Sequence, residues 1–355
     1  MKKKLYYKDK QPIGLDISQT GLKVMAVDTR RWLVQGYGSV DLDPAKIHDV
    51  LNNSKDDDNY LEENIRKLIK HNLVGNLPSN HVVIGLPTSR TFSRTFSLPA
   101  NQEKTLAEAV EIEAEQYIPL PVNTLYIDYE VIERSKESLQ IVMSAIPRTI
   151  VDVAIKAAWA ADLRPVAIEP SINASARLLE MTEEGHLTTL IIDIGQAATD
   201  IAVLSRGAIR VTGGVNVGGN TFTLDISNKL KVPLNNAHQL KVLSGLSLGP
   251  RQDKITKAVA PSLERITAET RKVMRFYAER LGESDKIDQV LIIGAGSNVP
   301  GIGEYFTNEL VMPVRVASPW QKLDFGHLPQ PNKQFRPRYI TVAGLASAPT
   351  REILQ

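Results

Sequence analysis

The chain has 355 residues, of which 43% are hydrophobic and 23% charged, and its 42 basic and 40 acidic side chains leave a formal net charge of +2. Chains of this length usually divide into more than one hydrophobic core, and the balanced charge argues against a nucleic-acid-binding protein. The absence of cysteine excludes disulfides, thiolate catalysis and cysteine-containing metal sites.

The N-terminal residues are basic and are not followed by an apolar segment. They read MKKKLYYKDKQP, which lacks the apolar core of a signal peptide. Nowhere in the chain do eighteen apolar residues follow one another. We therefore expect a soluble, cytoplasmic protein.

Two distant segments share one pattern. Residues 13–28 read IGLDISQTGLKVMAVD and residues 190–205 read LIIDIGQAATDIAVLS. In each, an apolar strand ends in Asp-Ile, a turn of small and polar residues follows, and a second apolar strand begins. Asp16 and Asp193 occupy the same place in the pattern, 193 − 16 = 177 residues apart, which is close to half the chain. The repeat predicts two related lobes, each opening with a β-hairpin that carries an acidic residue at the strand end.

Between the two hairpins the pattern predicts sheet and helix. Strands are expected at 81–87, 91–99, 125–133 and 139–147, with a charged helix at 102–117, a helix at about 148–162, a strand within 165–170 and a helix at 171–181. After the second hairpin we expect a strand at 206–214, a helix at 218–230 and a helical region from about 236 to 281. A strand, a glycine turn and a helix then follow within 288–310, and a last helix within 339–348.

The repeated acidic residues suggest a metal–nucleotide site. A carboxylate beside a phosphate is repulsive unless a divalent cation lies between them. The adjoining turns hold small or polar residues whose N–H groups and hydroxyls can face phosphate oxygens. An isolated hairpin of this kind is more simply a turn whose Asp accepts hydrogen bonds from turn N–H groups; its recurrence in both halves favours the site.

Two further segments could complete such a site. The stretch 291–301, LIIGAGSNVPG, places a glycine turn after an apolar strand, where backbone can approach a ligand closely. It is not the dinucleotide fingerprint, because Val299 stands at the third glycine position. In the helix that follows residue 260, Glu269 and Lys272 form an i, i+3 pair, which is either an ordinary surface pair or a contact to ribose and adenine.

The order of these segments resembles the actin-like ATPase superfamily over nearly the whole chain. Within it, residues 111–133, EIEAEQYIPLPVNTLYIDYEVIE, resemble the PilM family of type IV pilus assembly proteins, which is related to the division protein FtsA. The resemblance implies an α/β, two-lobed actin-like fold of duplicated RNase H-like type, with an inserted FtsA-type α+β subdomain. We expect the first lobe to comprise 1–80, 163–187 and 335–355, the insert 81–162, and the second lobe 188–334, with a helical subdomain at about 225–285.

The resemblance also implies the residues of the nucleotide site. The first phosphate loop would hold Asp16, Ser18, Gln19 and Thr20, and the second Asp193, Gly195 and Thr199, with Gly218 and Gly219 in the matching stretch VNVGGNTFT. Asp16 and Asp193 would act on Mg²⁺ through water. Gly294, Gly296 and Ser297 would face the adenosine of ATP or ADP, with Glu269 and Lys272 near the ribose or base. Glu169 would take the place of the residue that activates water in superfamily ATPases, and at most weak ATPase activity is expected.

The implied function is that of a scaffold of the pilus assembly platform at the inner membrane. The resemblance implies that a groove between the first lobe and the insert binds the N-terminal tail of a PilN-type membrane protein. Other platform or motor components and a homo-oligomer are further possible partners, and the membrane would be reached only through partners. Three alternatives stay open: an FtsA-like division protein, a small-molecule kinase of the same superfamily, and a fold that no longer binds nucleotide. The ending LASAPTREILQ lacks the basic amphipathic helix by which the first of these would bind a bilayer.

Overall fold

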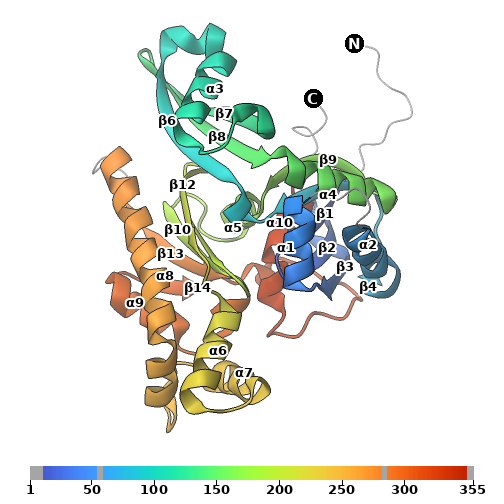
Figure 1. Cartoon of the computed structure of the whole chain (residues 1–355), viewed down its shortest axis with the longest axis vertical. Helices are drawn as coiled ribbons and strands as arrows, with labels where there is room; N and C mark the ends of the chain where they lie inside the picture. The colour runs from blue at the N-terminus through green and yellow to red at the C-terminus, as the bar shows by residue number, and fades with distance from the viewer. Residues whose placement is uncertain (1–10, 54–58, 282–285, 350–355) are drawn as a thin grey trace.

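The computed structural model describes residues 11–53, 59–281 and 286–349. The sequence expectations for residues 1–10 and 350–355 therefore lie outside the described part of the chain. Two sheet-and-helix lobes lie side by side, and a smaller subdomain stands over them, with the long helix α8 (Gln252–Leu281) along the outer side of the second lobe (Figure 1).

The first lobe is built on a six-stranded sheet in the order β4-β3-β2-β1-β5-β9. Its strands are β1 (Ile13–Ser18), β2 (Gly21–Asp28), β3 (Leu33–Asp41), β4 (Leu73–Gly75), β5 (His81–Leu86) and β9 (Arg164–Pro170). Ile13, Leu15 and Ile17 alternate toward one face, where they pack with α1 (Pro44–Asn53), α2 (Tyr60–His71) and α4 (Arg148–Ala160). The other face packs against α5 (Ser171–Thr182) and α10 (Ile340–Ala346).

The second lobe repeats this plan with a five-stranded sheet in the order β12-β11-β10-β13-β14. Its strands are β10 (Thr189–Ile194), β11 (Thr199–Ser205), β12 (Ala208–Val215), β13 (Gln289–Ile293) and β14 (Val314–Val316). One face packs against α6 (Gly219–Leu230), α7 (Leu234–Leu243), α8 and α9 (Ile302–Leu310). Ile191, Leu291 and Ile293 on the opposite face join α5 and α10 in a core shared by the two lobes.

The insert is a three-stranded antiparallel sheet in the order β6-β8-β7, covered on one face by a helix. Its elements are β6 (Phe92–Pro99), α3 (Leu106–Tyr117), β7 (Leu125–Arg134) and β8 (Ser138–Pro147). Val110 and Ala114 of α3 pack on Ile141 and Met143 of β8. The remaining short helices are η1 (Thr88–Arg90), η2 (Ala100–Thr105), η3 (Val122–Thr124), η4 (Ala295–Asn298), η5 (Pro319–Gln321) and η6 (Arg336–Tyr339).

The expected insert boundaries of 81 and 162 are wrong. Strand β5 pairs in parallel with β1 and β9 in the middle of the first-lobe sheet, and Ile150 and Ala154 of α4 lie in the first-lobe core. The insert is therefore the segment between β5 and α4. The expected end of the second lobe at 334 is also too late, because Asp324 exchanges backbone hydrogen bonds with Trp32 and Val34 of the first lobe, and Phe325 packs edge-on against Tyr37.

The two predicted hairpins are confirmed. Strands β1 and β2 are antiparallel with Asp16 opposite Lys23, and β10 and β11 are antiparallel with Asp193 opposite Asp200. In both lobes the acidic residue lies one or two positions before the end of its strand, so the repeat in the sequence is a repeat in the structure. Within the described ranges, none of the helices combines the length and the apolar character needed to cross a bilayer.

Candidate functional site

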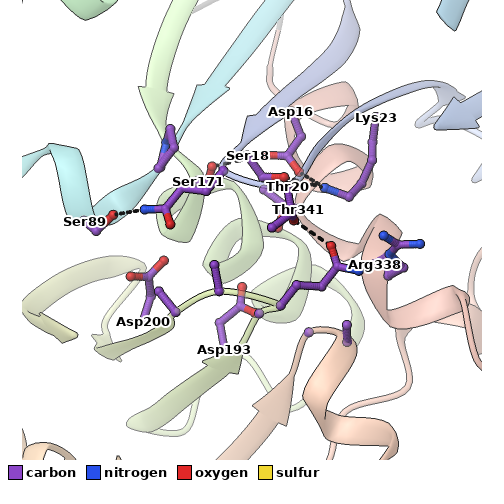
Figure 2. A pocket seen from close by; sticks show the side chains of 18 of the residues that line it. Asp16, Ser18, Thr20, Lys23, Ser89, Ser171, Asp193, Asp200, Arg338 and Thr341 are labelled. Carbon is purple, nitrogen blue, oxygen red and sulfur yellow. Dashed lines mark hydrogen bonds and ion pairs between the residues drawn. The ribbon is translucent and has the colours of Figure 1, made fainter. Parts of the chain in front are cut away.

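The turns of the two hairpins face each other across a pocket of about 120 Å³. In Figure 2, Asp16 and Lys23 lie on the first-lobe wall and Asp193 and Asp200 on the second-lobe wall. Seven of the residues predicted from the sequence line this pocket: Asp16, Ser18, Gln19, Thr20, Asp193, Gly195 and Gly294. The structure thus brings together both acidic residues and both predicted loops.

On the first-lobe wall, Asp16 is buried and held by polar side chains. Lys23 Nζ lies 2.7 Å from Asp16 Oδ2 and 3.3 Å from Ser18 Oγ, and Ser171 at the start of α5 donates to Asp16 Oδ1 at 3.3 Å. A buried carboxylate needs a partner charge or hydrogen bonds, because leaving water is costly. Lys23 supplies that charge and presents an ammonium to the same pocket.

On the second-lobe wall, two carboxyl groups lie directly across a strand pair. Burial, and then the nearby charges of Asp200 and Asp16, raise the pKa of Asp193 to about 7, although Lys23 acts in the opposite direction. Burial also raises the pKa of Asp200 to about 6, against a hydrogen bond from Thr88. Like charges this close are unfavourable unless a cation joins them, so this wall is suited to a cation or to a shared proton.

Side-chain hydrogen bonds link the first loop to the second loop and to η1 in this structure. Thr20 Oγ1 donates to Gln196 Oε1 at 2.6 Å across the cleft, and Gln19 Nε2 donates to Ser89 Oγ at 3.1 Å. Pockets that enclose whole ligands measure roughly 300–1,000 Å³, so the pocket of about 120 Å³ has room for the phosphate groups of a nucleotide and not for the whole molecule.

The glycine turn after β13 forms the floor beside Asp193. Gly294 has φ 80°, a conformation that favours glycine, and a Cβ there would meet Asp193 Oδ1 and the carbonyl of Ile194. Gly296 lies against Ile194 so closely that a side chain would collide. Ser297 is buried and donates to the Gly294 carbonyl at 2.8 Å, so it shapes the turn and does not line the pocket.

Other predicted residues support the second loop from behind. The Gly219 N–H donates to the Gly195 carbonyl at 2.9 Å, and a Cβ on Gly218 would lie 2.6 Å from the Gln196 carbonyl oxygen. Thr199 is fully buried and donates to the Val217 carbonyl at 2.7 Å. These residues hold the loop in place without reaching the pocket.

Three more predicted residues lie away from the pocket. Glu169, expected to activate water, forms an ion pair with Arg177, whose Nη1 and Nη2 lie 2.9 and 2.5 Å from its two oxygens. Glu269 and Lys272 on α8 pair with each other at 3.4 Å, and Glu269 lies beside Gly213 of β12. Each of the three side chains therefore forms an ion pair within the protein, outside the pocket.

Sequence reasoning missed several residues of the pocket. Lys23 and Asp200 could have been found, because a hairpin that pairs Ser18 with Gly21 must also place Lys23 opposite Asp16, and the same counting applies to Asp200. Arg338 and Thr341 could not, because η6 and the start of α10, which carry them, return to the cleft from the C-terminal end of the chain (Figure 2).

The oxygen donors fit a magnesium ion held indirectly. Mg²⁺ prefers carboxylate, hydroxyl, water and phosphate oxygens, and Asp16, Asp193 and Asp200 direct carboxylates at one pocket. Among the residues that the structure describes, however, no three acidic or histidine side chains are close enough to hold a metal ion directly. A magnesium ion here would take part of its coordination from water and phosphate.

Comparisons with known proteins agree with this geometry. The family model described as "Type IV pilus assembly protein PilM" matches residues 14–348. A solved PilM-PilN type IV pilus biogenesis complex has a TM-score of 0.79 and 22% identity over 96% of this chain and 98% of that one. The ethanolamine utilization protein EutJ from Carboxydothermus hydrogenoformans has a TM-score of 0.55 and 16% identity over 94% of this chain and 88% of its own.

Among curated proteins, the cell division protein FtsA of Neisseria meningitidis serogroup B is 28% identical over 203 residues, 52% of this chain and 47% of FtsA. The chain spans about half the length of the curated relatives it matches. The structural matches extend over nearly the whole chain and confirm the expected actin-like, two-lobed fold.

Proposed function

The chain belongs to the type IV pilus assembly protein PilM family, whose model matches residues 14–348, and we propose that it is an actin-like nucleotide-binding scaffold of the pilus assembly platform. The observation that carries the nucleotide part is the pairing of two acidic hairpin turns, one from each lobe, across a single pocket.

The ligand proposed is ATP or ADP with Mg²⁺. Asp16 and Asp193 would face the ion through water, the hydroxyls of Ser18 and Thr20 and the ammonium of Lys23 would face phosphate oxygens, and the turn at Gly294 would lie along the nucleoside. The ion supplies charge neutralisation between carboxylates and phosphates when bound. Because Glu169 is engaged by Arg177, we propose hydrolysis that is weak at most.

The partner proposed is the N-terminal cytoplasmic tail of a PilN-type membrane protein. Strand β7 is an edge strand of the insert, and an extended peptide can pair with the free backbone groups of such an edge. Tyr126 of β7 donates to Asp152 of α4 at 3.0 Å and lies against the Arg148 guanidinium. The edge of β7 and the start of α4 therefore offer backbone, aromatic and charged groups together, where the insert meets the first lobe.

Such a partner would also bring the protein to the membrane. In the solved type IV pilus biogenesis complex, a PilM protein is found together with PilN. We propose a cytoplasmic protein that reaches the inner membrane through the tails it binds. Other platform components and a second copy of this chain are further proposed partners. A small-molecule kinase remains the alternative that ATP consumption stimulated by a metabolite would support.

Calorimetry of the full chain with a PilN-type tail peptide tests the partner. The expected result is 1:1 binding that Tyr126→Ala weakens at least about tenfold, because Tyr126 on β7 is 42% exposed and exposed aromatic residues at the centre of an interface contribute most of its affinity. Leu243→Ala is the matched control, since Leu243 is 75% exposed on the second lobe, away from the insert. Equal losses for both variants, or no binding to the wild type, would reject this location or this partner respectively.

A further inference from the structure

The pocket between the two lobes has a third wall, formed by the segment of the chain that leads into α10. Pro337 and Arg338 of η6 and Thr341 of α10 line this wall, on the side of the pocket away from Ser89 (Figure 2). Neither hairpin contributes to it. The third wall therefore adds a guanidinium group that the two predicted phosphate loops do not supply.

The charged side chains around this pocket differ in how firmly they are paired. Its lining includes three carboxyl groups and two cations, namely Asp16, Asp193, Asp200, Lys23 and Arg338. The Lys23 ammonium lies 2.7 Å from the carboxylate of Asp16, and both side chains are largely buried. Arg338 instead donates from Nη2 to Oδ1 of Asp41 at 2.8 Å, and Asp41 does not line the pocket.

The ion pair between Arg338 and Asp41 is exposed on one side only. Asp41 is the last residue of β3 and its side chain is 79% exposed, whereas the Arg338 side chain is 17% exposed. An ion pair with a solvent-exposed partner contributes little, because water screens the attraction. A phosphate group inside the pocket is a stronger partner, because hydrogen bonds from arginine to phosphate are charge-assisted and often bidentate.

The backbone that carries Arg338 is fixed to both lobes. The next residue, Tyr339, is 6% exposed, and its hydroxyl donates to Ser39 Oγ of the first lobe at 3.0 Å. On the other side, Asn298 of the second lobe donates from Nδ2 to the Gln334 carbonyl at 2.6 Å. Arg338 can therefore change its partner by rotation of its own side chain, without movement of η6.

We propose that Arg338 binds a phosphate oxygen of the nucleotide, and that Asp41 competes with the nucleotide for the guanidinium. This inference rests on the proposed function of the pocket, and it adds a pair of residues that sets the affinity for the ligand. Without ligand, Asp41 holds the Arg338 side chain. When a phosphate occupies the pocket, the guanidinium leaves the exposed carboxylate and donates to the phosphate. A carboxylate outside the pocket thus lowers the affinity of the pocket.

Removal of the competing carboxylate tests the exchange directly. Asp41→Asn in the full chain is expected to strengthen Mg·ATP binding about two- to fivefold in calorimetry, which is the range of an exposed ion pair. The same variant removes an ion pair from the folded protein, so its midpoint in urea should stay the same or fall slightly. A gain of affinity without a gain of stability distinguishes competition from a purely structural role, in which affinity and stability would fall together.

Asp49→Asn is the matched control for the change of charge. Asp49 lies on α1 of the first lobe, its side chain is 71% exposed, and its partner is His48. The control removes the same charge without altering the partner of Arg338, so it should change the Mg·ATP affinity by less than about 1.5-fold. An equal gain in Asp41→Asn and Asp49→Asn would assign the effect to net charge and overturn the exchange.

Arg338 itself is tested by Arg338→Met, which removes the hydrogen-bond donors and keeps an unbranched side chain. Mg·ATP affinity is expected to fall about tenfold or more. Arg336→Met is the control in the same η6, because Arg336 donates to the Pro331 carbonyl and to Gln330 outside the pocket, and it should stay within about twofold of the wild type. In the double variant of Arg338→Met and Asp41→Asn, the gain from Asp41→Asn should vanish, because no guanidinium remains to be released.

The outcomes separate this inference from the proposal on which it rests. If Mg·ATP does not bind the wild type, both fall. If Mg·ATP binds the wild type and Arg338→Met binds it equally well, only the role of Arg338 falls. If Asp41→Asn fails to strengthen binding, or strengthens it as much in the Arg338→Met background, the competition is rejected while the nucleotide site stands.

Discussion

Replacing Asp193 by asparagine is expected to change stability and nucleotide affinity in opposite directions. Asparagine keeps the size of the side chain and removes its charge. In the native protein this carboxyl is partly buried, lies opposite Asp200 and shares its pocket with Asp16, and its pKa is raised to about 7, first by burial and then by these two charges. The variant therefore removes a charge that costs free energy in the folded protein, through its burial and through repulsion, and that costs nothing in the unfolded chain.

The size of the effect follows from the pKa. The ordinary value of 3.8 applies to the unfolded chain, and the native value is about 7, so the native state holds the Asp193 proton more strongly by about three pH units, or about 4 kcal/mol. This contribution to the free energy of unfolding is fully present below pH 3.8 and is lost as the pH rises through 7. At pH 8 Asp193→Asn is expected to be about 2–4 kcal/mol more stable than the wild type, and at pH 4 nearly equal to it.

Urea unfolding at both pH values measures the first effect, and calorimetry with Mg·ATP measures the second. Affinity for Mg·ATP is expected to fall at least about tenfold, because the carboxylate that faces the ion is lost. Asp253→Asn, at an exposed carboxylate in the first turn of α8, is the control and should change neither property much. Equal stability of Asp193→Asn and wild type at pH 8 would refute the predicted cost of the charged carboxyl, and an unchanged affinity would remove Asp193 from the site.

Three further changes probe the same region. Lys23→Met leaves the buried Asp16 without its partner charge and is expected to lower the free energy of unfolding in urea by about 3 kcal/mol. Adding Asp16→Asn should restore most of this loss, and a double variant whose loss equals the sum of the two single losses would contradict the reasoning. Gly294→Ala, at φ 80° with a Cβ directed at Asp193 Oδ1, should cost about 2 kcal/mol or more and weaken Mg·ATP binding, and wild-type midpoints in denaturant would contradict it. Burial lowers the pKa of Lys241 from 10.5 to about 8, so between these values the unfolded chain binds a proton that the native protein lacks. The stability of the wild type relative to Lys241→Met should rise from pH 7.5 to 10.5 by about 3 kcal/mol at most, and parallel pH curves would refute this.

The two-lobed arrangement could be predicted because the same hairpin pattern occurs twice in the sequence. Asp16 and Asp193 stand at equivalent places in two short hairpins, and a hairpin with a two-residue turn fixes its register without help from the rest of the chain. The same register also places Lys23 opposite Asp16. Lys23 was missed only because the cross-strand pairs were not followed from the turn to that position.

The positions of Glu169 and of the insert boundary depended on contacts that no local pattern contains. Glu169 pairs with Arg177 because a strand and the following helix pack at an angle that brings residues eight apart together. Strand β5 looks like the first strand of the insert in the sequence, since it precedes β6 directly, yet it completes a parallel pairing with β1 and β9. Parallel neighbours are joined by long crossovers, so sequence proximity does not identify them.

Two partly buried carboxyl groups distinguish the second-lobe wall of the cleft from the residues that only support it. The residues that hold the second loop from behind, Gly218 and Thr199, have their hydrogen bonds made within the protein. Asp193 and Asp200 instead face each other with raised pKa values, an arrangement that lowers stability and that folding alone would not favour. A cation that binds between these carboxyl groups removes an unfavourable contact of the folded protein, so ligand binding and stability are coupled at this wall.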